Sequence, residues 1–375
     1  MPCARDPSRV GMLDRRGFLR LAGYGGVGLL AARVGVPLAS TGVLDPSTVS
    51  RMEFDVSYRT VVHDLPSDAE DVQLWIPLPP TDAAQEIHDL TIESPLAYEI
   101  KKTSTYGNRL VHVQTGRRPT PFDVEVRYRV VRHRVGARRE TLDAAAAAKY
   151  LRLTERVRVT NEVEAFAAQA MGEGGRPIDA ARKAYDAIID LLAYDKLIPG
   201  CGTGDTAWIM KHKRGKCDDY HALFMAMLVS RGIPVRWQQG FPLPYPSSAD
   251  RVDAASGRLS GDCSGAHCWV SFYDPELGWV PVDVSEADKN PPMRGFFFGN
   301  LTPNRFQISE GRSIGLNPAQ GFDPLSTFAF AYAEADGLPL IYPENYENIV
   351  TFTVTGVATS SESEGRAGGG SPEPG

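Results

Sequence analysis

The segment that follows residue 50 alternates between apolar and polar residues with a period of two. The alternation occurs in four runs between residues 51 and 134, which are bounded by Pro, Asp, Gly and Asn: MEFDVSYRTVV, DVQLWIPLP, LVHVQT and FDVEVRYRVVRHRV. This pattern is typical of half-buried antiparallel strands separated by turns. We therefore expect residues 50–135 to form a small β-sandwich-like domain.

The pattern changes to that of helices at Thr141. An alanine-rich stretch begins there, and two segments with apolar residues at three- and four-residue spacing follow it, NEVEAFAAQAM and DAARKAYDAIIDLLAYD. A Gly-Glu-Gly-Gly-Arg-Pro break at 172–177 separates these two segments. The sequence therefore predicts a second, helix-rich domain after the β-sandwich.

A buried helix in this second region carries the strongest candidate for chemistry. The run from Ala222 to Val229 is apolar on nearly all sides, and Gly232 with Pro234 ends it. The helix should begin near Gly215, which places Cys217 in its first turn. The helix dipole and the free backbone N–H groups there favour a thiolate over a thiol. Such a thiolate is a nucleophile, and the same N–H groups could hold an oxyanion.

Other interpretations of this helix start remain open. Cys217 could be a small buried hydrophobic residue, as most free cysteines are. His221 lies one turn further along and is the rival base, although a partner on the same helix is poorly placed to reach over the sulfur. Asp218 and Asp219 would oppose a thiolate nearby, so we expect their carboxylates to face away from the sulfur.

A second segment predicts a β-hairpin, because two β-rich runs, HCWVSFY and WVPVDVS, are joined by Asp-Pro-Glu-Leu-Gly. If the loop at 274–278 pairs Tyr273 with Trp279, then His267 becomes the diagonal neighbour of Asp283 on one face, with about 7 to 8 Å between their α-carbons. The Asp283 carboxylate could then hold one ring nitrogen and leave the other to take the thiol proton. A one-residue slip would put the two on opposite faces, and they would then be a structural histidine and a strand-end aspartate.

The helix and the two hairpin strands resemble the transglutaminase-like superfamily, whose members use a cysteine, a histidine and an aspartate in that chain order. Matching the motifs assigns these catalytic roles to Cys217, His267 and Asp283. The family also often uses an upstream tryptophan or an amide side chain near the oxyanion. Trp208 and Gln238 are the local candidates, and packing or surface roles are the alternative for both.

This resemblance extends from about Asp179 through residues 296–312 and into 332–337. It implies an α+β fold with a papain-like transglutaminase core, in which helices pack on an antiparallel sheet and the helix bearing the cysteine faces the strands bearing the histidine and the aspartate. The small β-sandwich precedes this core. We accordingly expect residues 141–345 to form the catalytic domain.

A triad of this kind attacks an amide or ester carbonyl and forms a thioester acyl-enzyme. The resemblance favours hydrolysis of peptide or amide bonds outside the cytoplasm, with a peptide or protein as substrate. An amine acceptor would instead give a protein-glutamine crosslinking transferase. A hypothesis of another class is a non-catalytic binding or scaffolding module, in which the β domain is the functional part.

Composition narrows the range of partners. The 375 residues are 42% hydrophobic and 23% charged, with 40 Lys and Arg against 46 Asp and Glu. The basic residues are scattered, which argues against nucleic acid. The histidines are not spaced for zinc, and the glycine-rich loop at 199–205 lacks the lysine and the serine or threonine of a P-loop, so we expect no metal and no cofactor. In an exported protein, Cys201, Cys263 or Cys268 could take part in a disulfide.

The N-terminus predicts export. Arg15, Arg16 and the weakly apolar stretch after them resemble a twin-arginine signal, which makes the twin-arginine export machinery a partner. The apolar run at 21–32 is about half of the roughly 20 residues that span a bilayer. We therefore expect residues 1–40 to be removed and the protein to be periplasmic or extracellular, with membrane attachment only through an uncut signal. Residues 360–375 are expected to be a disordered polar tail.

Overall fold

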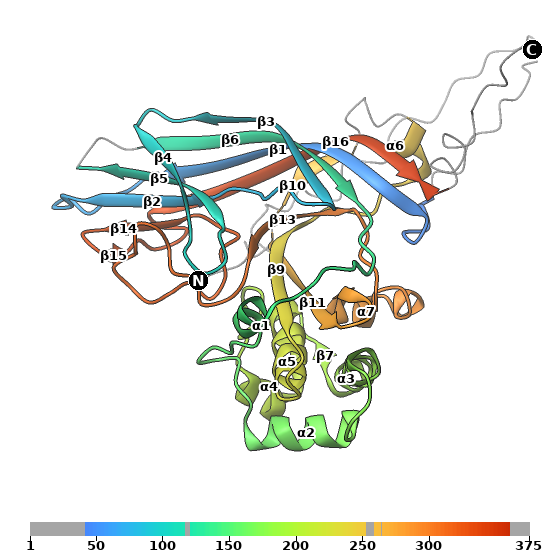
Figure 1. Ribbon diagram of the computed structural model, residues 1–375. Coiled ribbons are helices and arrows are strands. Elements are labelled where there is room, and N and C mark those ends of the chain that lie inside the picture. Colours follow the sequence, from blue (N-terminus) through green and yellow to red (C-terminus); the bar gives the residue numbers. More distant parts are fainter. Residues whose placement is uncertain (1–41, 117–120, 253–258, 264, 361–375) are drawn as a thin grey trace, which may run out of the picture.

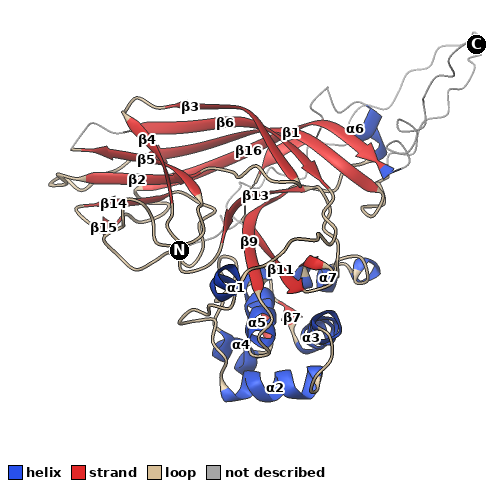
Figure 2. Cartoon of the chain, viewed as in Figure 1, coloured by secondary structure: helices blue, strands red, loops and turns tan. Residues whose placement is uncertain are grey.

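The computed structural model describes residues 42–116, 121–252, 259–263 and 265–360. A β-sandwich and a smaller part made of helices and a sheet lie one above the other, and β9 (Val235–Pro242) and β13 (Arg305–Glu310) run between them (Figure 1). Most helices gather in the smaller part (Figure 2). The expected export signal and the polar tail beyond Ser360 lie outside the described residues. In the described ranges, none of the helices is both long enough and apolar enough to cross a bilayer.

The sandwich consists of two five-stranded antiparallel sheets, with strand orders β10-β16-β1-β6-β3 and β15-β14-β2-β5-β4. Buried and exposed residues alternate along its longest strands, as the period-two pattern predicts. The buried faces of both sheets share one hydrophobic core. The strands of the first half of the chain are β1 (Val49–Val62), β2 (Val72–Pro77), β3 (Gln85–Glu93), β4 (Tyr98–Lys102), β5 (Arg109–Thr115) and β6 (Phe122–His133).

The C-terminal part of the chain returns to complete this sandwich. β14 (Tyr332–Ala335) pairs with β2, and β16 (Tyr346–Thr359) pairs with β1 along its whole length. β10 (Ser260–Asp262) and β15 (Leu338–Pro339) extend the two sheets. The expected division into 50–135 and 141–345 is therefore wrong at its C-terminal end. Without β16, the long strand β1 would present an unpaired edge.

The second part packs helices on a four-stranded antiparallel sheet of order β12-β11-β9-β13, which is the α+β layout expected from the sequence. The central helix α5 (Cys217–Val229) is buried over nearly its whole length and contacts β11 (His267–Asp274). The other elements are α1 (Ala144–Tyr150), α2 (Asn161–Met171), α3 (Pro177–Leu191), β7 (Ala193–Tyr194), α4 (Thr206–His212), β8 (Arg214–Gly215), α6 (Ser248–Val252), β12 (Gly278–Val282), α7 (Val284–Lys289) and the 3-10 turn Pro291–Met293.

The hairpin β11–β12 has the predicted register, with Tyr273 opposite Trp279. On its other side β11 pairs with β9, so that Cys268 lies opposite Gln239. Cys268 belongs to the hydrophobic core around α5, and directly opposed residues of an antiparallel pair share a face. The hairpin therefore presents alternate residues to the N-terminal end of α5.

Strand β9 belongs to both hydrophobic cores. Trp237 packs with α5 in the lower core, whereas Phe241 packs in the core of the sandwich. Between them, a β-carbon on Gly240 would lie 1.8 Å from the carbonyl oxygen of Phe306 on β13, so only glycine allows this close approach of two backbones. The two parts of the molecule are thus joined by a shared strand as well as by loops.

Truncation tests this arrangement. A chain that ends at residue 345 loses β16, and with it the buried side chains of Val350, Phe352 and Val354. Each such side chain contributes about 1.5 to 3 kcal/mol of burial free energy, against a total stability of roughly 5 to 15 kcal/mol. We expect this chain to lack cooperative thermal unfolding by circular dichroism. A chain that ends at Ser360 keeps every described strand and should unfold like the full protein; equal melting curves for the two chains would contradict the placement of β16.

Candidate active site

Cys217 is the first residue of α5, and its side chain is almost fully buried, with 4% of the residue exposed. Its sulfur lies 3.8 Å from the carbonyl oxygen of Cys201, in the glycine-rich loop at 199–205. The loop therefore covers the start of the helix.

Asp219 fixes this loop on the helix. One carboxylate oxygen accepts hydrogen bonds from the backbone N–H groups of Thr203 and Gly204, both at 2.9 Å, and the other accepts the Lys216 N–H at 2.8 Å. A β-carbon on Gly202 would lie 2.2 Å from the Asp219 carboxylate, which explains the glycine there. The carboxylate is committed to these donors rather than to the sulfur.

The neighbouring Asp218 forms a buried ion pair with Arg312, which follows β13. Both aspartates of the first turn thus bind elsewhere, and the expectation that they face away from the sulfur is confirmed. The backbone N–H of Asp218 donates to the carbonyl of Cys201 at 3.0 Å. This group is therefore not free to hold an oxyanion, in contrast to the expectation from the helix start alone.

His267 and Asp283 are in direct contact. Nε2 of His267 lies 2.7 Å from Oδ2 of Asp283, as the hairpin register predicts. The same carboxylate accepts a hydrogen bond from Arg305 at 2.6 Å and from the backbone N–H of Glu286, at the start of α7, at 2.9 Å. Asp283 is completely buried. Since Asp283 occupies Nε2, the remaining ring nitrogen, Nδ1, is the one left to exchange a proton with a thiol.

The electrostatics favour an ion pair between Cys217 and His267. Hydrogen bonds from Cys201, Cys268 and His267 outweigh burial and hold the pKa of the Cys217 thiol well below its ordinary value. Burial acts to lower the pKa of His267, but the charge and hydrogen bond of Asp283, with the contact to Cys217, raise it to about 9. At a pH between the pKa of Cys217 and that of His267, a thiolate beside an imidazolium is the favoured state.

Burial would raise the pKa of Asp283, but the charges of His267 and Arg305 hold it well below its ordinary value. This carboxylate is therefore ionised throughout the neutral range. Its two cationic partners compensate the cost of burying the charge.

His221 has a different role from the rival base considered above. Its Nε2 accepts the Val284 N–H at 3.1 Å, and its Nδ1 lies 2.7 Å from the carbonyl oxygen of Cys217. An acceptor at Nε2 and a donor at Nδ1 define the neutral tautomer, and burial lowers the pKa of this imidazole. The ring accepts a hydrogen bond from Val284, the first residue of α7, so it ties α5 to α7.

The structure does not bring the two oxyanion candidates into this group. The ring of Trp208 stacks on His212 within α4, with 4.4 Å between the ring centroids. Gln238 bonds Gln307 and Ser271 on the face of β9 opposite to Cys268. The contacts that define the Cys217 site include neither residue.

Arg305 and Arg312, which bind the two buried aspartates, and Gln239, opposite Cys268, were not expected from the sequence. Arg305 and Arg312 lie within the stretch that resembled the family, but no local pattern connects them with Asp283 and Asp218. Gln239 is the direct neighbour of Gln238 and lies on the Cys268 side of the sheet. Strand alternation would have found it, since it separates adjacent residues onto opposite faces.

The other cysteines are thiols in the structure, and Cys263 lies in the sandwich core, away from this site. Burial raises the pKa of Cys263 and of Cys268 well above the ordinary value. Within the described residues, no group of three or more His, Cys, Asp or Glu side chains is arranged to hold a metal ion.

Comparison with known proteins identifies the class of this part of the chain. Residues 164–284 match the family described as the transglutaminase-like superfamily. They form a transglutaminase-like domain with the papain-like α+β core expected from the sequence. The match includes Cys217, His267 and Asp283, and it ends before residues 296–312 and 332–337, to which the resemblance was expected to extend.

Individual relatives show how far the similarity reaches. An uncharacterized protein of Haemophilus influenzae is 24% identical over 353 residues, which cover 84% of this chain and 94% of the relative. YebA of Bacillus subtilis is 30% identical over 84 residues, which are 22% of this chain but 11% of YebA. The crystal structure of a candidate cysteine protease from Cytophaga hutchinsonii superposes with a TM-score of 0.47 and 15% identity, covering 80% of this chain and 98% of that one.

The lowered pKa of Cys217 predicts selective alkylation. At pH 6 an ordinary thiol, with a pKa of about 8.5, is almost fully protonated, whereas Cys217 keeps its thiolate until the pH falls through its depressed pKa. We expect iodoacetamide at pH 6 to label Cys217 at least about tenfold faster than Cys201, Cys263 or Cys268, as measured by peptide mass spectrometry. Equal rates for the four cysteines would contradict the thiolate.

Replacement of Asp283 by Asn should remove both the orientation and the charge that His267 needs. The pKa of His267 should fall from about 9, and labelling of Cys217 at pH 6 should slow by about tenfold for each unit that its own pKa rises. Because Arg305 then lacks its buried counter-charge, we expect a loss of about 3 kcal/mol in the free energy of unfolding.

Asp288→Asn is the matched control for this change. Asp288 lies on the same helix, α7, where it accepts a hydrogen bond from Tyr220 at 2.8 Å without contacting His267. Its replacement should leave the labelling rate unchanged. If both variants label Cys217 as fast as the wild-type protein, Asp283 does not sustain the ion pair.

Proposed function

We propose that this protein is a thiol hydrolase of peptide-like amides that acts outside the cytoplasm, with Cys217 as nucleophile, His267 as general acid and base, and Asp283 as the residue that positions His267. The observation that carries this proposal is the chain of contacts from a fully buried carboxylate, through Nε2 of His267, to a thiol of depressed pKa at a helix start. The match of residues 164–284 to the transglutaminase-like superfamily supports it.

The proposed reaction begins when the Cys217 thiolate attacks the amide carbonyl carbon, which forms a C–S bond and a tetrahedral oxyanion. His267 then gives its Nδ1 proton to the leaving amine as the C–N bond breaks, and a thioester remains on Cys217. A water molecule attacks this thioester while His267 takes its proton. The C–S bond breaks, the carboxylic acid leaves, and the thiolate and imidazolium are restored.

The oxyanion donor in this proposal is the backbone N–H of Cys217 itself. As the first residue of α5, Cys217 has an N–H with no intrahelical acceptor, and this N–H lies at the positive end of the helix dipole. The Asp218 N–H is unsuitable because Cys201 already accepts it. Water is the simplest acyl acceptor because it requires no second binding site on the protein.

The compartment forms a separate part of the proposal. Arg15 and Arg16 and the apolar run after them support export through the twin-arginine route, which carries folded proteins. A site that depends on reduced Cys217 benefits from folding in the reducing cytoplasm before transport. After export the protein would act as a periplasmic or extracellular enzyme.

Activity is tested with the chain that lacks residues 1–40, an N-acylated glutamine-containing peptide and a fluorescent primary amine. We expect mass spectrometry to show free-acid products, either at the glutamine side chain or at a peptide bond, and a transient acyl adduct on Cys217. Cys217→Ala should lower this activity by about 10⁴-fold or more while the protein stays folded. Cys263→Ala, in the sandwich core, should keep it.

The same experiment separates the alternatives. Incorporation of the amine without free acid would replace the hydrolase by a crosslinking transferase with the same nucleophile. A protein that forms no adduct with this or any other peptide in a mixed library, and whose Cys217 labels slowly, would be a non-catalytic binding module.

A further inference from the structure

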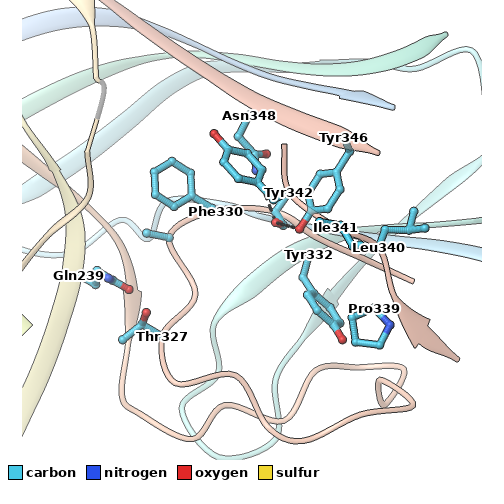
Figure 3. Close-up of a pocket in the computed structure, with 12 residues that line it drawn as sticks. Gln239, Thr327, Phe330, Tyr332, Pro339, Leu340, Ile341, Tyr342, Tyr346 and Asn348 are labelled. Carbon is cyan, nitrogen blue, oxygen red and sulfur yellow. Dashed lines mark hydrogen bonds between the residues drawn. The ribbon is translucent and has the colours of Figure 1, made fainter. Parts of the chain in front are cut away.

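An uncharged, partly open cavity lies between β9 and the C-terminal strands of the sandwich. Its volume is about 270 Å³, and it is lined by β9, by the segment before β14 and by the start of β16. Figure 3 shows Gln239 and Thr327 on one side and the rings of Tyr332 and Tyr346 on the other. None of the residues that line the cavity carries a charge. Since an apolar cavity of about 150 Å³ holds a benzene ring, this one is large enough for an aromatic side chain.

Three polar side chains around the cavity are hydrogen-bonded within the protein, whereas a fourth has an unpartnered atom. The Tyr346 hydroxyl donates to the carbonyl of Ala331, the Tyr332 hydroxyl donates to Glu334, and Asn348 bonds Thr60. Gln239 is 2% exposed, yet its amide oxygen has no hydrogen-bond partner in the part of the chain that the structure describes. A buried amide of this kind is unfavourable unless a ligand bonds it.

The position of Gln239 connects the cavity with Cys217. Gln239 lies opposite Cys268 and on the same face of the sheet. The Cys268 sulfur lies 3.5 Å from Nδ1 of His221, which in turn lies 2.7 Å from the carbonyl oxygen of Cys217. A second cavity, of about 340 Å³, is lined by Cys201, whose carbonyl oxygen lies 3.8 Å from the Cys217 sulfur, and by Asp218, the next residue of α5. The two cavities share Thr327, Tyr332 and Pro339 in their walls. They are therefore adjacent parts of one groove, and the second cavity reaches Cys201 and Asp218 next to the nucleophile.

We propose that this groove binds the acyl part of the substrate, with a large apolar or aromatic side chain in the 270 Å³ cavity and its peptide group on the amide of Gln239. A primary amide both donates and accepts, so it matches the C=O and N–H of a peptide group. The absence of charge in the lining excludes acidic and basic side chains from the cavity, because a charge buried there would have no partner. The proposal rests on the proposed function and specifies its substrate class: peptides with a bulky uncharged residue near the bond that is cleaved.

Binding is measured on the Cys217→Ala chain lacking residues 1–40, which prevents turnover. The probes are N-acetyl-phenylalaninamide, N-acetyl-alaninamide and N-acetyl-aspartate amide, and the readout is the dissociation constant from ligand-observed NMR titration. We expect the phenylalanine probe to bind at least about tenfold more tightly than the other two. Equal affinities, or a preference for the aspartate probe, would overturn the proposal.

Two adjacent glutamines provide a matched pair of variants. Gln239→Met keeps the length of the side chain but removes the amide, and we expect it to weaken binding of the phenylalanine probe about tenfold. Gln238→Met changes the neighbouring residue on the opposite face, outside the cavity, and should leave binding unchanged. Equal effects of the two variants would contradict a contact between Gln239 and the probe.

A variant at the rim of the groove keeps the proposal testable if Gln239→Met does not fold. Thr327 is only partly buried and lies in the wall shared by both cavities, so Thr327→Trp should obstruct the groove without entering either core. It should abolish the preference for phenylalanine over alanine, and retention of that preference would count against the groove.

The binding experiments can fail or succeed independently of the test of hydrolysis. Selective binding by a protein that forms no acyl adduct on Cys217 would leave the groove in place and remove the enzyme. Hydrolysis with the same KM in the wild-type protein and in Gln239→Met would remove the groove and leave the enzyme.

Discussion

The buried carboxylate of Asp283 is the constraint around which the candidate site is assembled. It is a full charge with no access to water, so the fold must supply donors from several directions. Arg305 comes from β13, His267 from β11, and the backbone N–H of Glu286 from the first turn of α7. The need to compensate one negative charge thus fixes three elements that are distant in the sequence, and the orientation of the imidazole follows from it.

Most of the local structure could be predicted from the sequence because it depends on neighbouring residues. The alternation in β1 and β6 and the three-to-four spacing in α2 and α3 identify these elements directly. The hairpin register also follows from a short loop, which is why the contact between His267 and Asp283 could be anticipated. The position of Cys217 at the start of a buried helix required only the apolar run and its glycine and proline stop.

The rest depends on contacts that no local pattern encodes. The segment ENIVTFTVTG, within β16, alternates as clearly as β1 does, but nothing near it indicates that its partner lies about 300 residues earlier. Arg305 and Arg312 look like surface residues until Asp283 and Asp218 are brought to them in space. Choosing correctly between Gln238 and Gln239 requires knowing which of them lies on the same face of β9 as Cys268. This face becomes known only from the pairing of β9 with β11.

The strand β9 has a consequence for how such a protein can change over evolution. The two ends of β9 belong to different hydrophobic cores, and the arginines that neutralise Asp283 and Asp218 lie beyond residue 284. The segment that carries the nucleophile therefore cannot be moved to another protein as an independent unit. Moved alone to another protein, it would bring two buried aspartates without their cations. Inheritance of the chemistry therefore requires inheritance of β13 and of Arg312 just after it, together with the segment that carries the nucleophile.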